Sequence, residues 1–313
     1  MHAIHHTSTS SRASAWLLAA RPRTLPLACA SIFLGSGLAV QEGGFQTTVL
    51  VLALVTAILL QVLSNLANDY GDAVSGADDE RRIGPQRAVA SGLLSLDAMR
   101  RGMWVAASGA AIAGLLLVWQ ALGADPLKAV LFLLFGVIAL AAAVTYTVGV
   151  RHYVPYGYRG LGDLAVFVFF GLLGVLGTAY LHAQTLSVGA LLPAVACGLL
   201  CAAVLNVNNV RDIESDAQSG KITLAIRLGR RRAIGYHWGL LAVAFLATLA
   251  FLLLYRVSWL GWGALAAWAP LIKAPMVMAQ CRDGATLTAM LKLTALATLA
   301  YSVLLSAGLV LGG

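Results

Sequence analysis

The sequence predicts an all-α protein, a polytopic transmembrane bundle of about nine spanning helices around a central cavity. Of its 313 residues, 60% are hydrophobic and only 11% are charged, whereas soluble domains average about 45–50% apolar and about 25% charged residues. The mean hydropathy is +0.84. Because so little charge cannot cover a surface exposed to water, a soluble globular domain, a coiled coil and a disordered chain are excluded.

The spanning helices are expected where apolar residues run for about 20 positions, the length that crosses a bilayer. Nine such stretches follow one another, at 24–40, 47–67, 102–121, 127–150, 161–182, 188–207, 233–255, 259–279 and 287–311. Polar, charged or turn-forming residues separate them, at 41–46, 68–101, 122–126, 151–160, 183–187, 208–232, 256–258 and 280–286. Residues 1–15 are expected to form a polar N-terminal tail, and residues 16–313 a single transmembrane domain.

Lysines and arginines are distributed unevenly between the two sides of this bundle. With the N-terminus inside, 17 of the 21 fall in inner segments, only Lys128 and Arg256 fall outside, and Lys273 and Lys292 lie within apolar stretches. Cytoplasmic loops are enriched in Lys and Arg. The N-terminus and both long connections, 68–101 and 208–232, are therefore predicted to be cytoplasmic. The net charge of +8 follows from this orientation, and we expect no nucleic-acid partner.

The two long connections begin alike, which indicates two pseudo-repeated halves. In each, an Asn precedes an Asp by four residues and another Asp follows within about one turn: Asn65, Asp69 and Asp72 in the first, and Asn208, Asp212 and Asp216 in the second. If the preceding helices continue, each set lies on one helix face. The sequence therefore predicts two acidic faces on the same side of the membrane.

Carboxylates at the mouth of an apolar bundle need cations, since one Asp at mid-membrane costs about 2.5–3.5 kcal/mol on insertion scales. The available donors are oxygens, with no His or Cys nearby, so Mg²⁺ is the expected metal rather than zinc. Arg87, Arg211 and Lys221 are suited to phosphate oxygens. Solvated loop acids that balance the basic face are the alternative, but they do not explain two matching faces.

A metal–diphosphate site at the mouth of an apolar bundle predicts a lipid diphosphate substrate. Metal ions would stabilise the leaving group while an allylic carbon–oxygen bond ionises. Aromatic faces can stabilise the resulting cation. Five tyrosines near the predicted cytoplasmic boundary are candidates, with anchoring in the membrane interface as their alternative role: Tyr70, Tyr146, Tyr153, Tyr156 and Tyr158.

Several segments resemble the intramembrane aromatic prenyltransferase superfamily, and more narrowly its 1,4-dihydroxy-2-naphthoate polyprenyltransferase branch. The resemblance runs from about Trp16 to the C-terminus. Its segments are 21–26 (RPRTLP), 64–72 (SNLANDYGD), 83–87 (IGPQR), 146–147 (YT), 158–163 (YRGLGD), 208–216 (NNVRDIESD), 220–221 (GK) and 227–229 (RLG).

The resemblance implies Mg²⁺-dependent transfer of a polyprenyl group from its diphosphate to 1,4-dihydroxy-2-naphthoate. The acceptor carboxylate is lost, giving demethylmenaquinone, in a bacterial inner membrane and in contact with membrane lipid. The implied catalytic and metal-binding residues are Asp69, Asp72, Asp212 and Asp216, with Asn65 and Asn208 as further metal ligands and Tyr146 as a catalytic residue. The implied diphosphate-binding residues are Arg87, Lys221, Arg211, Asn68 and Asn209. Arg21, Arg23 and Arg159 are candidates for binding the acceptor.

One position departs from the superfamily pattern, because the third Asp of its first motif is Gly76 here. Asp78 or Asp79 would have to replace it. Two alternatives stay open. One is transfer to another aromatic acceptor such as 4-hydroxybenzoate, and the other is a secondary transporter, whose internal repeats and charged sites are similar.

Overall fold

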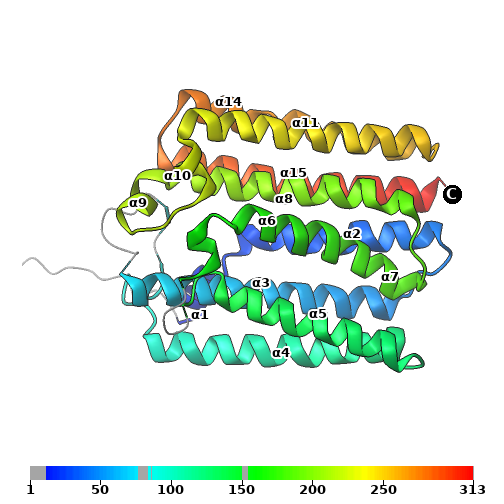
Figure 1. Ribbon diagram of the computed structural model, residues 1–313, viewed down its shortest axis with the longest axis horizontal. Coiled ribbons are helices and arrows are strands. Elements are labelled where there is room, and N and C mark those ends of the chain that lie inside the picture. Colours follow the sequence, from blue (N-terminus) through cyan, green and yellow to red (C-terminus); the bar gives the residue numbers. More distant parts are fainter. Residues whose placement is uncertain (1–11, 77–83, 86, 150–153, 313) are drawn as a thin grey trace, which may run out of the picture.

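The computed structural model describes residues 12–76, 84–85, 87–149 and 154–312. Its long helices run side by side along one direction (Figure 1). Within these ranges nine segments are long and apolar enough to cross a bilayer: Arg12–Gln41, Thr47–Ser75, Leu96–Leu122, Pro126–Thr145, Gly162–Ala183, Val188–Arg211, Arg230–Leu254, Trp259–Gln280 and Gly284–Leu311. The predicted all-helical membrane bundle is confirmed.

The elements follow one another in three groups. The first four spans contain α1 (Arg12–Ala20), η1 (Pro22–Thr24), α2 (Leu25–Gln41), α3 (Thr47–Ser75), α4 (Leu96–Leu122) and α5 (Pro126–Thr145). The middle of the chain contains η2 (Tyr156–Arg159), α6 (Gly162–Val166), η3 (Phe167–Leu176), α7 (Gly177–Ala183), η4 (Val188–Ala190), α8 (Leu191–Arg211), α9 (Ile213–Gln218) and α10 (Leu224–Leu228). The last three spans contain α11 (Arg230–Leu254), α12 (Trp259–Trp262), η5 (Gly263–Ala267), α13 (Trp268–Leu271), α14 (Lys273–Gln280) and α15 (Gly284–Leu311).

Three of the long helices begin at polar caps that the sequence supplies. The side chains of Ser95, Asp125 and Asp283 accept hydrogen bonds from backbone N–H groups in the first turns of α4, α5 and α15. These bonds satisfy donors that have no partner inside the helix. The cap residues therefore fix where the three spans start.

Three spans are less regular than predicted. Helix α1 includes residues 12–15 of the expected tail, and its Ala15 and Ala19 are buried. The fifth span is π-helical over η3, a geometry common at functional sites. The eighth span is divided into α12, η5, α13 and α14. Pro270 and Pro275 lie within it, and proline cannot donate the backbone hydrogen bond of a continuous helix.

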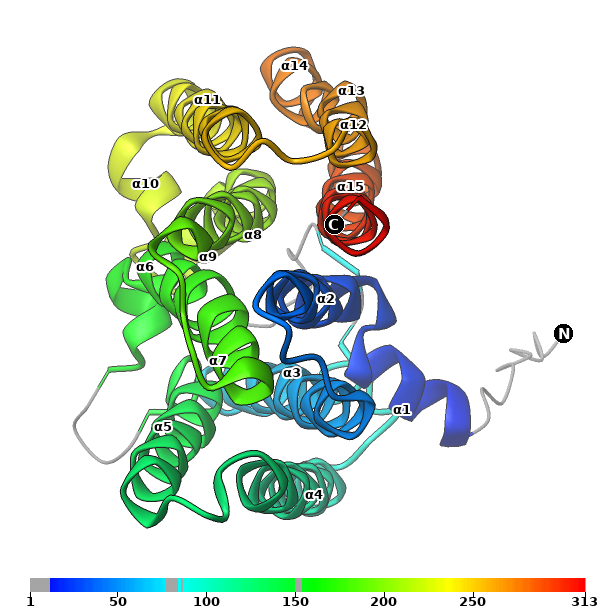
Figure 2. The same ribbon diagram turned by 90° about the vertical axis from the view of Figure 1, so that its right-hand side faces the viewer.

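The largest hydrophobic core lies among α2, α8, α11, α14 and α15. Small residues allow close packing there, since a Cβ added at Gly37 of α2 would lie 2.5 Å from Ser306 Cβ of α15. Viewed along the helices, α2 lies near the middle of the bundle, between α15 and α3 (Figure 2). By contrast, no described residue of α5 is buried. Helix α5 is therefore peripheral, and several of its residues line the cavity described below.

Candidate active site

A cavity of about 730 Å³ lies among α2, α3, α4, α5, η3 and α8. Aliphatic and aromatic side chains line most of it, among them Phe132, Phe169 and Leu173. Eight charged side chains of the described residues also line it: Arg21, Arg23, Asp72, Arg87, Arg211, Asp212, Asp216 and Lys221. Five of these are cations and three are anions. The chamber, as we call this cavity, thus combines an apolar interior with charged groups, and the described ones carry a net positive charge.

The first acidic face lies on α3, whose helix continues to Ser75 as the sequence predicts. Helix α3 ends at Gly76, which adopts a left-handed conformation with φ 71°. Glycine is favoured there because it lacks a Cβ. The position where the superfamily has its third Asp is therefore the C-cap of α3. The proposed substitutes Asp78 and Asp79 lie outside the described residues.

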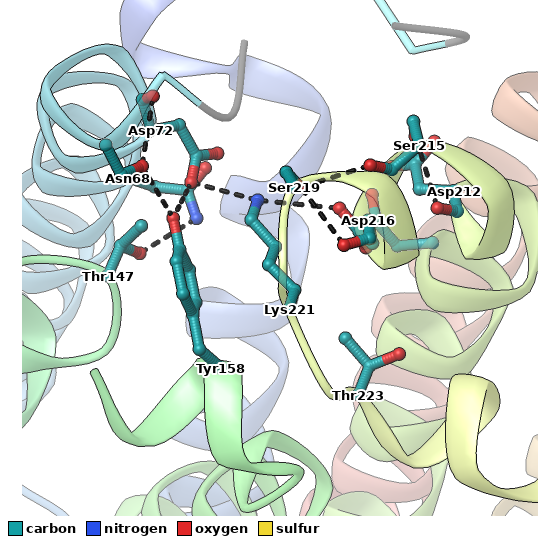
Figure 3. A network of polar contacts seen from close by, with 12 residues as sticks. Asn68, Asp72, Thr147, Tyr158, Asp212, Ser215, Asp216, Ser219, Lys221 and Thr223 are labelled. Atoms are coloured by element: carbon teal, nitrogen blue, oxygen red, sulfur yellow. Dashed lines mark hydrogen bonds and ion pairs between the residues drawn. The ribbon is translucent and has the colours of Figure 1, made fainter. Parts of the chain in front are cut away.

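Asp72 is fully buried and is the centre of a polar network (Figure 3). Its Oδ1 accepts a hydrogen bond from the Tyr158 hydroxyl at 2.5 Å and lies 2.9 Å from Lys221 Nζ. Its Oδ2 accepts from Arg87 Nη2 at 3.0 Å. Burial and the charge of Asp72 raise the pKa of Tyr158 above its usual value. The hydroxyl therefore stays protonated at neutral pH and donates to the carboxylate.

Asp69 is also buried but is absent from the chamber wall. Its Oδ2 accepts a hydrogen bond from the backbone N–H of Ala88 at 3.0 Å. Among the described residues, no group donates to its Oδ1. Asp69 thus fixes the segment that carries Arg87, and it keeps one carboxylate oxygen available.

The second acidic face begins where α8 ends. Helix α8 ends at Arg211, and Asp212 is its C-cap, so the predicted continuous helix is interrupted before α9. Arg211 holds Asp212 in a bidentate pair, with Nε 2.8 Å from Oδ1 and Nη2 2.6 Å from Oδ2. Arg211 also donates to Asn208 Oδ1 and to Thr288 Oγ1. Such bidentate pairs are geometrically specific.

Lys221 joins the two faces. Its Nζ lies 2.9 Å from Asp72 Oδ1 and 3.5 Å from Asp216 Oδ1. The same ammonium lies over the ring of Tyr158, 4.9 Å from the ring centroid, within the range of a cation–π interaction. Figure 3 shows Lys221 between the two carboxylates. Residues about 150 positions apart in the chain are thereby brought to one point.

The asparagines of the first motif connect neighbouring segments. Asn68 accepts from Arg21 Nη2 at 2.7 Å and donates to Thr147 Oγ1 at 3.0 Å. Asn65 donates to Ala20 O and to Thr24 Oγ1. Both asparagines line the chamber. Their amides tie α3 to the entry of α2 and to the end of α5.

Three of the predicted tyrosines line the chamber: Tyr146, Tyr156 and Tyr158. The rings of Tyr146 and Tyr156 meet edge to face, with centroids 5.3 Å apart. Burial raises the pKa of Tyr156 to about 12, and its hydroxyl donates to Ala142 O. Tyr70 packs in a separate core cluster, and Tyr153 lies outside the described residues.

Most of the predicted site residues meet at the chamber. It is lined by Arg21, Arg23, Asn65, Asn68, Asp72, Arg87, Tyr146, Asn208, Asn209, Arg211, Asp212, Asp216 and Lys221. Asp69 is behind its wall, and Arg159 is exposed and away from it. No role was predicted for Thr147 or Thr288, whose hydroxyls accept hydrogen bonds from Asn68 and Arg211. Thr147 lies in one of the segments that resemble the superfamily, whereas Thr288 is a lone threonine with no spacing signal.

The donor set of the chamber fits Mg²⁺ chemically, because it consists of carboxylate and amide oxygens. The unpartnered Oδ1 of Asp69 is a further oxygen donor close by. Within the described residues, however, no three acidic, His or Cys side chains converge as a ready-made metal cluster. The acids instead have cationic partners from the protein itself. A metal would therefore need additional ligands from elsewhere.

The fold and the site define a helical integral membrane protein with a charged site at one end of an apolar chamber. The profile of the UbiA prenyltransferase family matches residues 28–296. The chain belongs to this family, which confirms the resemblance found in its Asp-rich motifs. It is therefore a prenyltransferase by family.

The chain is similar over most of its length to two bacterial proteins. It is 48% identical over 273 residues to the 1,4-dihydroxy-2-naphthoate octaprenyltransferase of Escherichia coli strain K12, covering 87% of this chain and 85% of that protein. It is 45% identical to the Haemophilus influenzae protein of the same name, covering 95% and 96%. The fold is similar to that of an Archaeoglobus fulgidus UbiA homologue bound to GPP and Mg²⁺, with a TM-score of 0.63, 13% identity and coverage of 93% and 99%.

Proposed function

We propose that this protein transfers a polyprenyl group from an allylic polyprenyl diphosphate to 1,4-dihydroxy-2-naphthoate. The acceptor loses its carboxylate, and the product is demethylmenaquinone. One observation carries the proposal: acidic and basic side chains from α3 and from the α8–α9 region meet at one apolar chamber. The high identity to naphthoate octaprenyltransferases over 95% of the chain supports this acceptor.

The charged part of the chamber is proposed to bind the diphosphate. Arg87, Arg211 and Lys221 supply cations, and arginine matches phosphate oxygens through paired N–H groups. Asn68 and Asn209 add polar contacts. Asp72, Asp212 and Asp216 are proposed to hold Mg²⁺, with Asp69, Asn65 and Asn208 as further oxygen donors. When bound, Mg²⁺ would neutralise charge on the leaving diphosphate.

The apolar part of the chamber is proposed to hold the prenyl chain and to exclude water from the allylic cation. Tyr146, with Tyr156 at its edge, presents an aromatic surface near the charged residues, which would stabilise a cation. An apolar groove between α5 and η3 adjoins the chamber, and both are lined by Phe135 and Leu173. A cavity of about 730 Å³ is a usual size for one drug-sized ligand. A long chain would therefore extend into this groove and the lipid.

The acceptor carboxylate is proposed to bind Arg21 or Arg23, which line the chamber. Arg21 reaches Asn68 and is thereby held beside the first acidic face. Arg159, which is exposed and outside the chamber wall, is the weakest of the three candidates. The excess of Lys and Arg on one side supports a cytoplasmic site in the bacterial inner membrane.

The test is an assay with purified protein in liposomes, Mg²⁺ and a polyprenyl diphosphate. Labelled 1,4-dihydroxy-2-naphthoate and labelled 4-hydroxybenzoate are supplied in separate reactions. We expect a decarboxylated prenylated product from the naphthoate only. Product from 4-hydroxybenzoate alone would exclude the proposed acceptor, and prenyl transfer to neither would exclude the proposed reaction.

A further inference from the structure

The charges of the chamber favour an anion over a free metal cation. Five cationic and three anionic described side chains line it, so the described part of its lining has a positive net formal charge. Each lining carboxylate has a cationic neighbour: Arg87 and Lys221 for Asp72, Arg211 for Asp212, and Lys221 for Asp216. A divalent ion approaching alone would meet neutralised ligands and positive charge. A diphosphate would be attracted.

Lys221 is the cation whose position bears most directly on metal binding. Its Nζ contacts one carboxylate from each acidic face, at 2.9 Å and 3.5 Å. Oxygen ligands lie about 2.0–2.1 Å from Mg²⁺. An ion that bridges Asp72 and Asp216 would therefore occupy the volume in which the ammonium lies. The two cations exclude each other from this position.

We propose that Lys221 is an internal counter-ion that makes divalent-metal binding depend on a diphosphate. Without diphosphate, Lys221 neutralises Asp72 and Asp216. When a diphosphate is present, its oxygens provide Lys221 with an alternative partner, and the two carboxylates become available to the metal. This inference rests on the proposed function but concerns the order in which ligands bind, which the reaction itself does not determine.

The neighbours of Lys221 support such an exchange. Asp72 keeps hydrogen bonds from Arg87 and Tyr158, so it stays held when the ammonium leaves. Lys221 follows Gly220, which has φ 74°, and its backbone N–H donates to Asp216 O at 3.0 Å. The backbone is thus fixed beside Asp216, while the long lysine side chain has rotatable bonds to change partner.

Thermodynamic linkage makes the inference quantitative. If diphosphate raises the affinity for metal by some factor, metal raises the affinity for diphosphate by the same factor. Lys221→Met keeps most of the side-chain length and removes the charge, so it should increase the affinity for metal alone. Lys221→Arg keeps the charge and should retain the dependence on diphosphate. Lys292→Met is the matched control, because Lys292 is exposed on α15 and is not part of the chamber wall.

The experiment is equilibrium dialysis of Mn²⁺ against the purified protein in detergent, with and without inorganic diphosphate, corrected for Mn²⁺–diphosphate complexes in solution. For the wild type, Lys221→Arg and Lys292→Met we expect diphosphate to tighten Mn²⁺ binding at least about 10-fold, within the usual range of coupling. For Lys221→Met we expect Mn²⁺ alone to bind at least about 10-fold tighter than to the wild type, with the coupling reduced accordingly.

Two results would overturn the inference: wild-type protein that binds Mn²⁺ equally well without diphosphate, or Lys221→Met that binds Mn²⁺ alone no better than the wild type. Circular dichroism of each variant verifies folding. If Lys221→Met does not fold, the wild type measured with and without diphosphate still tests the inference. Either overturning result can occur in a protein that still forms the prenylated product, so it is distinguishable from failure of the proposed function.

Discussion

The ion pair between Asp72 and Lys221 predicts an energetic coupling between the two long cytoplasmic connections. Asp72 Oδ1 and Lys221 Nζ are 2.9 Å apart, and the two side chains are only 0% and 10% exposed. Removing one partner of a buried pair costs about 3–5 kcal/mol, because it leaves the other charge uncompensated. Asp72→Asn weakens the bonds from Arg87 and Tyr158 and leaves Lys221 with its longer contact to Asp216 at 3.5 Å, so we expect a loss of about 3 kcal/mol in the free energy of unfolding, the lower end of this range.

Lys221→Met should lower the free energy of unfolding by less, about 1.5–3 kcal/mol for the loss of one charged hydrogen bond. The cost is smaller because Asp72 retains its hydrogen bonds from Arg87 and Tyr158. In the double variant neither charge of the pair remains. The double variant should therefore lose less free energy of unfolding than the two single variants lose together, by about 1–3 kcal/mol. The assay is a double-mutant cycle of equilibrium unfolding in mixed micelles, followed by circular dichroism.

A matched control is available on the surface. Arg100 and Asp97 form an ion pair at 2.8 Å, but their side chains are 62% and 72% exposed, so their coupling should be about 0.5 kcal/mol or less. If Asp72→Asn and Lys221→Met are additive within about 0.5 kcal/mol, the buried pair does not hold the two connections together. The reasoning from burial would then be refuted.

Three further perturbations test the site. Removing divalent metal with a chelator should abolish turnover, and restored Mg²⁺ should recover it; full activity with excess chelator would contradict the metal assignment. Asp212→Asn should lower kcat at least about 100-fold, the usual effect of losing one electrostatic contact to the reacting groups. Glu214→Gln, whose side chain is 70% exposed, should have little effect, and equal turnover of the two variants would contradict the assignment. Gly71→Ala should destabilise the protein by about 1–3 kcal/mol, because its Cβ would lie 2.6 Å from Thr147 O. Gly136→Ala is the control, because a Cβ there has no neighbour within 4 Å. Equal melting temperatures of the two variants would show that α3 does not need this close approach.

The fold and much of the site follow from local sequence patterns. Spans of apolar residues and their polar boundaries predicted the bundle because the bilayer sets their length. The prediction of one helix face carrying Asn65 and Asp72 agrees with the structure, because α3 stays helical to Ser75. Helical periodicity did not distinguish Asp69 from Asp72, although these positions are separated by about 60° around the helix. That difference decides which side chain lines the chamber and which accepts from Ala88.

Other features depend on tertiary contacts that one sequence does not encode locally. The contact of Lys221 with Asp72 brings together segments separated by 149 positions. The sequence identified Lys221 only as a cation suited to phosphate. The break of the helix at Asp212 was also missed, although Arg211 next to it pairs with both carboxylate oxygens. Acidic and basic side chains that alternate in a connection can form several different ion pairs, and the tertiary packing determines which ones form.

The pairing selected here explains how two acidic faces can be stable beside an apolar chamber. Four carboxylates at a low-dielectric boundary would repel one another and favour protonation. The chain avoids this cost because each connection brings its own cations, Arg87 to Asp72 and Arg211 to Asp212, and Lys221 joins the two connections. The same cations are the groups that a diphosphate would bind. Stability without ligand and affinity for an anionic substrate therefore depend on the same side chains, and a substitution at any of them should change both.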